Sequence, residues 1–298
     1  MSFIEIKLIA PIEQLELLET ILLSKGAVSV TLKNNSSDDI LEPSVGEQPL
    51  WDSAQISGLF EKKIFSEQLC ESLKIDLQPF KCKLQIQELI DQDWERKCLE
   101  NYSPIYFGGD LWVCPSWQEP PDKSAVNLIL DPGLAFGTGT HATTALCLEW
   151  LAKTKLKNFT LIDYGCGSGI LAIAAILLGA EKAICIDNDP QAILSTKENI
   201  KKNNLDEDKF YCFSPKQFDE FIQNNTIEVN LLMANILANP LIELAPKFKK
   251  ILSRKSNLIL SGILCDQAEK VMAAYSDNIN FLESNSRDEW VMIFGRKA

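Results

Sequence analysis

A glycine-rich segment offers the clearest chemistry in this sequence. It follows an apolar run, begins at Asp163 and reads DYGCGSG, after which residues 170–178 have the composition of a helix. Glycines at a strand-to-helix turn let a ligand approach the backbone closely, and the amide groups of the helix that begins there face that ligand. The segment therefore predicts a cofactor site, either for a dinucleotide or for S-adenosylmethionine.

The spacing of the glycines separates these two cofactors. Dinucleotide enzymes use G-x-G-x-x-G, whereas this turn is G-x-G-x-G and has Ile170 at the place of the third dinucleotide glycine. An acidic residue just before the turn, Asp163, suits a cofactor that carries an ammonium group and no pyrophosphate. We therefore expect Asp163, Gly165 and Gly167 to bind S-adenosylmethionine, although the turn by itself leaves a nicotinamide-dependent dehydrogenase open.

A second carboxylate lies at the expected distance along the chain. Asp187 ends the apolar run 183–186, and 187 − 165 gives 22 residues. This is close to the roughly 20 residues after which a carboxylate meets the adenosine ribose in folds of this type. We predict that Asp187 binds the ribose and that Asp189, which precedes Pro190, caps the next helix.

An amide side chain ends a third apolar run. Residues 229–234 are expected to form a strand, and Asn235 follows it. Ligands of open α/β sheets bind beyond the carboxyl ends of the strands, where the Asn235 oxygen could accept a hydrogen bond from an amine and orient its lone pair towards a methyl donor. The alternative is that Asn235 stabilises the turn before Pro240.

A loop rich in glycine and threonine is predicted over residues 131–144, before a helix over residues 145–151. Loops of this composition often close over ligands, and its candidate residues are Phe136, Gly137, Thr138, His141 and Thr143. His141 is the only histidine in the chain. It could act as a general base or hold the loop in place.

Two different patterns of secondary structure surround these residues. Residues 3–9, 28–32, 54–60 and 81–89 are expected as strands, with helices over 12–25 and 66–73, in the order β-α-β-β-α-β. From residue 159 onward short apolar strands alternate with helices, which predicts a doubly wound parallel sheet. We expect a ferredoxin-like domain at 1–90, a helical connector or hinge at 91–100 and an α/β domain at 101–298.

Composition narrows the kinds of partner. The formal net charge is −12, which disfavours stable binding to nucleic acid and would suit a basic protein partner. The alternative is that the negative charge serves only to keep the protein soluble. The nine cysteines include no C-x-x-C pair, so no metal site is predicted. Without a signal peptide or an apolar run of membrane-spanning length, we expect a cytoplasmic protein that binds no membrane.

With these residues in view, the chain resembles the ribosomal protein L-11 methyltransferases, which are seven-stranded class I methyltransferases. The resemblance covers nearly the whole chain: the N-terminal domain, the connector around Trp94, the loop 131–144, the glycine turn, the segment 235–238, the segment 261–264 and the strand at Trp290. It implies that Thr144, Gly165, Asp187 and Asn235 bind the cofactor. It also implies that lysine side chains and the terminal α-amine of ribosomal protein L-11, free or on the ribosome, are methylated after presentation by the N-terminal domain.

Three other functions stay open at this stage. Enzymes that methylate a nucleic-acid amine or a glutamine amide usually follow the asparagine with Pro-Pro and an aromatic residue, whereas Leu237 and Ala238 stand at the later places here. A non-catalytic module with the same fold is disfavoured by the set Asp163, Gly165, Asp187 and Asn235. A nicotinamide-dependent dehydrogenase would bind NAD in place of S-adenosylmethionine.

Overall fold

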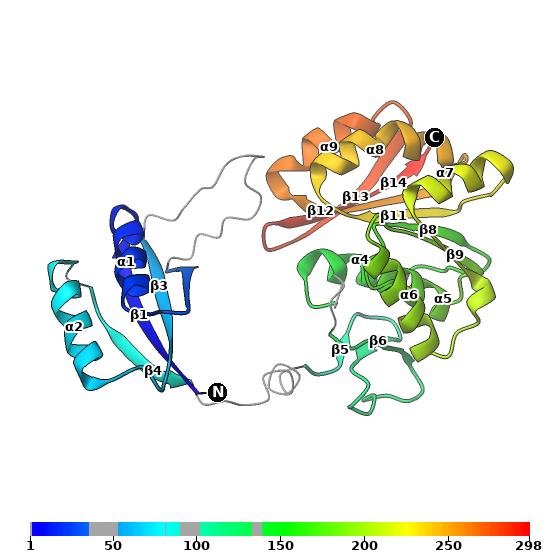
Figure 1. Cartoon of the computed structure of the whole chain (residues 1–298). Coiled ribbons are helices and arrows are strands. Elements are labelled where there is room, and N and C mark those ends of the chain that lie inside the picture. The colour runs from blue at the N-terminus through cyan, green and yellow to red at the C-terminus, as the bar shows by residue number, and fades with distance from the viewer. Residues whose placement is uncertain (1, 36–52, 81, 90–101, 133–138) are drawn as a thin grey trace. The chain divides into compact units, whose positions relative to one another are not determined.

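The chain forms two compact units, Met1–Lys97 and Cys98–Ala298, in a computed structural model that describes residues 2–35, 53–80, 82–89, 102–132 and 139–298. Figure 1 shows the helices and strands of the two units, and each unit has a hydrophobic core of its own. The predicted connector at 91–100 lies outside the described residues.

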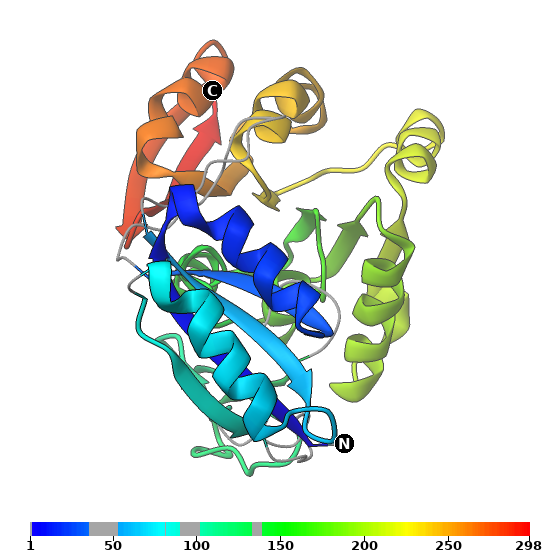
Figure 2. The same cartoon turned by 60° about the vertical axis from the view of Figure 1, so that its left-hand side comes forward.

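The N-terminal unit is a split β-α-β sandwich, as predicted. Its elements are β1 (Phe3–Pro11), α1 (Ile12–Ser24), β2 (Ser29–Asn34), β3 (Ser53–Glu61), α2 (Glu67–Leu77), the 3₁₀ turn η1 (Gln78–Phe80) and β4 (Gln85–Leu89). The strands are antiparallel in the order β2-β3-β1-β4, and α1 and α2 cover the same face of the sheet (Figure 2).

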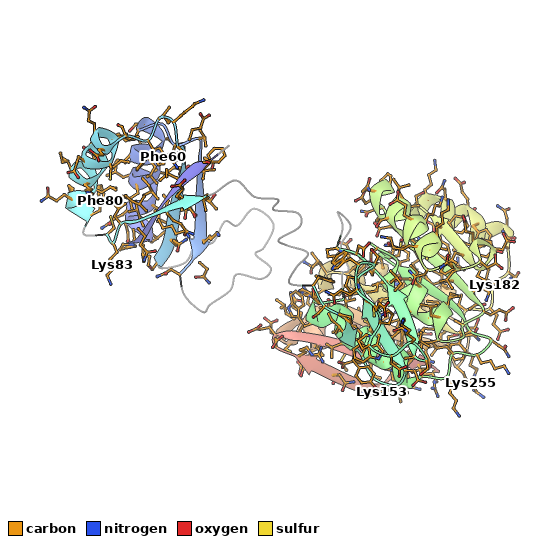
Figure 3. The ribbon with its side chains drawn as sticks, turned by 90° about the horizontal axis from the view of Figure 1, so that it is seen from below. Phe60, Phe80, Lys83, Lys153, Lys182 and Lys255 are labelled. Atoms are coloured by element: carbon orange, nitrogen blue, oxygen red, sulfur yellow. The ribbon has the colours of Figure 1, made fainter. Side chains whose placement is uncertain are left out.

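Alternation along β1 builds the core of this unit. Ile4, Ile6 and Leu8 are buried beneath the helices, whereas the residues between them are partly exposed. Phe60 of β3 lies in the same core (Figure 3). The strand expected at 81–89 begins only at Gln85, because Gln85 is the first residue that pairs with β1, opposite Lys7.

The second unit begins with a small sheet. It contains β5 (Ile105–Tyr106), β6 (Leu111–Cys114) and β7 (Val126–Ile129), of which β6 and β7 are parallel. These strands form a separate three-stranded sheet that leads into the main one.

The main sheet has seven strands in the order β10-β9-β8-β11-β12-β14-β13. The strands are β8 (Thr160–Tyr164), β9 (Lys182–Ile186), β10 (Phe210–Phe213), β11 (Leu231–Asn235), β12 (Asn257–Leu264), β13 (Ile279–Arg287) and β14 (Trp290–Lys297). Strands β8 to β12 are parallel, and β14 is antiparallel to both of its neighbours. This is the doubly wound fold that the sequence predicts.

Helices cover both faces of this sheet (Figure 1). One layer contains α4 (Ala142–Lys153), α5 (Ile170–Leu177) and α6 (Pro190–Lys202), and the other contains α7 (Pro215–Asn224), α8 (Ala238–Ile251) and α9 (Ala268–Tyr275); two short 3₁₀ turns are η2 (Glu207–Lys209) and η3 (Cys265–Gln267). Lysines such as Lys153, Lys182 and Lys255 extend outward (Figure 3). Among the described residues, no helix is long and apolar enough to cross a membrane.

Candidate functional site

The glycine turn joins β8 to α5 in a conformation that requires glycine. Gly165, Gly167 and Gly169 have φ angles of 79°, 55° and 78°, in the left-handed region. A Cβ at Gly165 would lie 2.3 Å from Cγ2 of Ile236. The backbone N–H groups of Gly165 and Cys166 donate to the carbonyl of Ile186 at 2.7 and 3.1 Å, which ties the turn to the end of β9.

Asp187 directly follows β9 and faces the turn. Its Oδ2 accepts the N–H of Gly167 at 2.9 Å, and its Oδ1 accepts the N–H of Asp189 at 3.0 Å. Each carboxylate oxygen has a second lone pair, so the half-buried carboxylate can also accept hydrogen bonds from hydroxyl groups. Asp189 caps α6, as predicted, because its side chain accepts the N–H of Gln191 at 2.8 Å.

Asn235 ends β11, the strand beside β8. Its Nδ2 donates to Oγ1 of Thr144 at 3.2 Å, although the two residues are 91 positions apart. With the amide nitrogen held in this way, the Asn235 oxygen is the group that can accept a hydrogen bond from an amine.

One cavity of about 210 Å³ brings these residues together. Five predicted residues line it: Thr144, Gly165, Gly167, Asp187 and Asn235. Five more residues that we did not predict complete its wall: Cys166, Ile170, Leu171, Asn188 and Ile236. Cys166, Asn188 and Ile236 are next to predicted residues in the chain, and Ile170 and Leu171 begin the helix that follows the turn; these positions were the available signal.

Asp163 lies behind the turn, and its side chain does not line this cavity. The residue is 1% exposed; its Oδ2 accepts the N–H of Ala172 at 3.2 Å, and its Oδ1 has no hydrogen-bond partner among the described residues. Burial raises the pKa of this carboxyl to about 7, with a smaller contribution from the charge of Asp187, although the hydrogen bond from Ala172 opposes the shift. A nearby cation would favour the charged form.

The loop predicted at 131–144 ends earlier than expected. Helix α4 begins at Ala142, so Thr143 and Thr144 belong to its first turn and are each 1% exposed. His141 is the N-cap residue: its Nδ1 accepts the N–H of Thr143 at 3.4 Å and lies 2.8 Å from Oγ1 of Thr143. This geometry supports the positioning role of His141. Phe136, Gly137 and Thr138 lie outside the described residues.

Ser261 connects three parts of the site. It lies opposite Asn235 in the β11–β12 ladder, and its carbonyl accepts the N–H of Ile236 at 3.1 Å. The Ser261 hydroxyl donates to the carbonyl of Thr143 at 3.2 Å. Strand β12 therefore positions both Asn235 and the start of α4.

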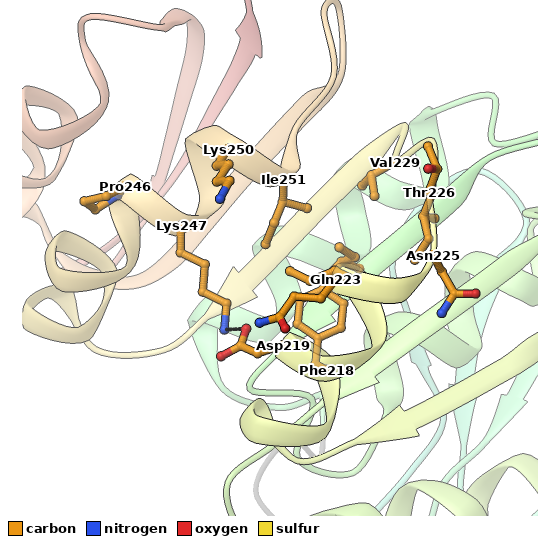
Figure 4. Close-up of a pocket in the computed structure, with 13 residues that line it drawn as sticks. Phe218, Asp219, Gln223, Asn225, Thr226, Val229, Pro246, Lys247, Lys250 and Ile251 are labelled. Carbon is orange, nitrogen blue, oxygen red and sulfur yellow. Dashed lines mark ion pairs between the residues drawn. The ribbon is translucent and has the colours of Figure 1, made fainter.

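A larger groove of about 710 Å³ lies elsewhere, between α7 and α8 (Figure 4). Phe218, Ile222 and Ile251 form part of its apolar lining, and Lys247 pairs with Asp219 at 2.5 Å. It borders Val229, before β11, whereas Asn235 stands at the other end of that strand. None of the predicted site residues that the structure describes lines this groove. Among the described residues, no group of three or more histidine, cysteine, aspartate or glutamate side chains is placed to hold a metal ion.

Comparison with known proteins identifies the family. A family model described as ribosomal protein L11 methyltransferase (PrmA) matches residues 2–298. The chain belongs to this family. The resemblance found from the sequence is therefore confirmed, and the chain is a methyltransferase enzyme with the expected fold class.

Individual members of the family agree with this assignment. A ribosomal protein L11 methyltransferase from Cellvibrio japonicus is 44% identical over 301 residues, covering 100% of this chain and 99% of that protein. One from Teredinibacter turnerae is 46% identical and covers 91% of this chain and 89% of its own length. The crystal structure of a ribosomal protein L11 methylase from Lactobacillus delbrueckii subsp. bulgaricus matches with a TM-score of 0.58 and 29% identity, covering 66% of this chain and all of that one.

Proposed function

We propose that the cavity beside the glycine turn binds S-adenosylmethionine and that this protein methylates lysine side chains and the N-terminal amine of ribosomal protein L11. The observation that carries the proposal is the convergence of Thr144, Gly165, Gly167, Asp187 and Asn235 on one cavity of a protein in this methyltransferase family. The names of its relatives supply the protein substrate.

The residues present fit this cofactor. The Asp187 carboxylate can accept hydrogen bonds from ribose hydroxyls, and the side-chain-free turn at Gly165 and Gly167 leaves the backbone accessible. The buried Asp163 carboxyl beneath the turn favours a cationic ligand, because a cation would stabilise its charged form. When bound, S-adenosylmethionine supplies an electrophilic methyl group on a positively charged sulfur.

The chain must then receive and orient a neutral amine. Lysine has an ordinary pKa of about 10.4, so the amine has to lose a proton before it can react. Desolvation beside the apolar side chains of Ile170 and Ile236 favours the neutral amine. The Asn235 oxygen accepts an amine N–H, and Thr144 fixes the amide plane, so that transfer proceeds in line by positioning rather than by acid–base chemistry at Asn235.

We assign recognition of the protein substrate to the N-terminal unit. Its helices occupy one face of the sheet, so the opposite face carries no helix from the described part of this unit. That face includes Glu5, Lys7 and Gln87 among the half-buried and exposed residues. The net charge of −12 suits a basic protein partner, and the ribosomal substrate places the reaction in the cytoplasm.

The substrate is tested with a labelled methyl donor. The purified protein is incubated with ribosomal extract from a strain that lacks the enzyme, and label is expected in one small basic protein. Label in nucleic acid would instead reject the proposed acceptor.

The role of Asn235 is tested by Asn235→Ala. We expect kcat to fall about 100-fold, the usual effect of misplacing a reacting group, with donor affinity changed much less. The control is Asn225→Ala, because Asn225 lies in the groove between α7 and α8 and should leave both quantities unchanged. Normal turnover by Asn235→Ala would rule out the proposed role.

A further inference from the structure

Three cysteine side chains meet beside the glycine turn. Cys166 belongs to the turn, Cys185 to β9 and Cys212 to β10. Cys185 and Cys212 are directly paired in the parallel ladder, so their side chains point to the same face of the sheet. All three belong to the core between that face and the layer of α4, α5 and α6.

Cys185 is the most deeply buried of the three cysteines. Its pKa is raised well above the ordinary value by the neighbouring Cys166 and Cys212 thiols and by burial. Cys166 Sγ lies 3.5 Å from Oγ1 of Thr196 on α6. Cys185 therefore has one thiol opposite it on the neighbouring strand and another in the turn that the end of β9 holds.

The strand geometry suits a bond between Cys185 and Cys212. Paired residues on neighbouring strands lie about 4.8 Å apart, whereas disulfides span Cα separations of about 4.4 to 6.8 Å. The two strands could therefore be joined with small backbone movements. The half-buried Cys212 is the more accessible of the two sulfurs.

The surroundings of Cys212 favour its reaction. The neighbouring Cys185 thiol lowers the pKa of the Cys212 thiol, burial opposes this effect, and the positive charge of Lys197 adds to it. Because the thiolate is the nucleophile, Cys212 is the sulfur expected to react first with an oxidant.

We propose that hydrogen peroxide joins Cys185 and Cys212 in a reversible disulfide that weakens binding of the methyl donor. The Cys212 thiolate attacks a peroxide oxygen and the O–O bond breaks, giving a sulfenic acid and, after protonation, water. The Cys185 sulfur then attacks the Cys212 sulfur, the S–O bond breaks and a second water leaves. In total, two thiols and one hydrogen peroxide give one disulfide and two waters.

The effect on binding of S-adenosylmethionine rests on the proposed function. It follows from Ile186 and Phe213, the residues that come directly after Cys185 and Cys212 in their strands. The carbonyl of Ile186 holds the N–H groups of Gly165 and Cys166. The carbonyl of Phe213 accepts the N–H of Asp187 at 3.2 Å. Bringing the two sulfurs within bonding distance requires small movements of these strand ends, and such movements displace the carbonyls that hold the turn and Asp187.

The full-length protein is treated with hydrogen peroxide, digested without reduction and analysed by mass spectrometry, and S-adenosylmethionine binding is measured by calorimetry before and after treatment. We expect a peptide pair linked through Cys185 and Cys212, and a Kd raised at least about fivefold, the lower end of usual coupling between sites. Dithiothreitol should restore both. Cys212→Ser should lose the response, whereas Cys265→Ser, which removes an exposed thiol, should keep it.

Any other result of this experiment contradicts either the proposed disulfide or the proposed function. No linked peptide, a peptide linked through Cys166 instead, or a linked protein whose Kd rises less than about fivefold overturns the proposal. If the reduced protein binds no S-adenosylmethionine, the proposed function fails and the effect on the donor fails with it. The linked peptide still decides, independently, whether this thiol pair forms a disulfide.

Discussion

At the scale of single residues, burial controls the charge of Asp163. Its pKa is about 7 in the folded protein, against 3.8 for an ordinary aspartate. The folded state therefore binds a proton that the unfolded state releases above pH 4. This contribution to stability is complete below pH 3.8 and is lost as the pH rises through 7.

We predict that part of the free energy of unfolding, about 2 kcal/mol, is lost between pH 5 and pH 7.5 because of this carboxyl group. Asp163→Asn should remove that part of the pH dependence, since the amide does not titrate. Urea unfolding of both proteins at the two pH values measures the difference. Equal pH dependence in the two proteins would show that Asp163 titrates normally.

Gly165 illustrates a second constraint that acts on a single residue. Gly165→Ala combines a positive φ with a Cβ that would lie 2.3 Å from a side-chain atom of Ile236. We expect a loss of about 2 kcal/mol of stability from crowding, in addition to the backbone cost, and weaker donor binding. Chemical denaturation and calorimetry measure the two effects.

Gly179→Ala is the matched control for that substitution. Gly179 also has a positive φ, 104°, but a Cβ there meets no atom of the described residues within 4 Å. The Gly179→Ala protein should lose only about 1 kcal/mol of stability, the cost of its backbone conformation, and should keep its affinity for S-adenosylmethionine. Similar losses of donor affinity in both variants would mean that crowding at Ile236 is unimportant.

At the scale of elements, α6 holds the glycine turn in place. Thr196 Oγ1 donates to the carbonyl of Gly167 at 3.0 Å, and Asn199 Nδ2 donates to the carbonyl of Ser168 at 2.9 Å. Both side chains are buried. The conformation of the turn therefore depends on a helix that follows it by about twenty residues, in addition to its own glycines.

We predict that Asn199→Ala costs about 2 kcal/mol of stability, because it leaves the buried Ser168 carbonyl without this donor, and that it weakens donor binding. The control is Asn224→Ala, whose exposed side chain makes a similar bond to the carbonyl of Glu220 and should change stability by less than about 0.5 kcal/mol. Thermal unfolding and calorimetry compare the two. A stable Asn199→Ala protein with normal donor affinity would contradict this role of α6.

At the scale of the whole molecule, binding and presentation are assigned to different units. Every described residue that lines the proposed cofactor cavity belongs to Cys98–Ala298, which has a hydrophobic core of its own. We predict that residues 98–298 alone bind S-adenosylmethionine with a Kd within about threefold of the full chain, because compact units with separate cores fold largely independently.

The same fragment should lose most of its activity on the ribosomal protein, since the proposed recognition surface belongs to the N-terminal unit. Calorimetry and methyl transfer from a labelled donor measure the two properties. A fragment that methylates the protein at the full rate would show that the N-terminal unit does not present the substrate.

Much of this organisation follows from local patterns in the sequence. Alternating apolar residues predicted the N-terminal strands, and the G-x-G-x-G spacing with Asp187 and Asn235 predicted four of the ten described residues that line the cavity. The start of α4 was missed because His141, rather than one of the common capping residues, caps the helix, and because threonines are weak helix formers. Burial of Thr143 and Thr144 outweighs that weak preference.

The sequence by itself therefore determined the order of the elements, the class of turn and the residue types at the strand ends, since these depend on neighbours along the chain. Only the tertiary structure decided which distant residues meet. Asn235 is hydrogen-bonded to Thr144, 91 positions away, and Cys185 lies opposite Cys212 on the neighbouring strand. Asp163 lies buried behind the turn. Such contacts depend on strand order and on packing between layers, and no local spacing specifies either.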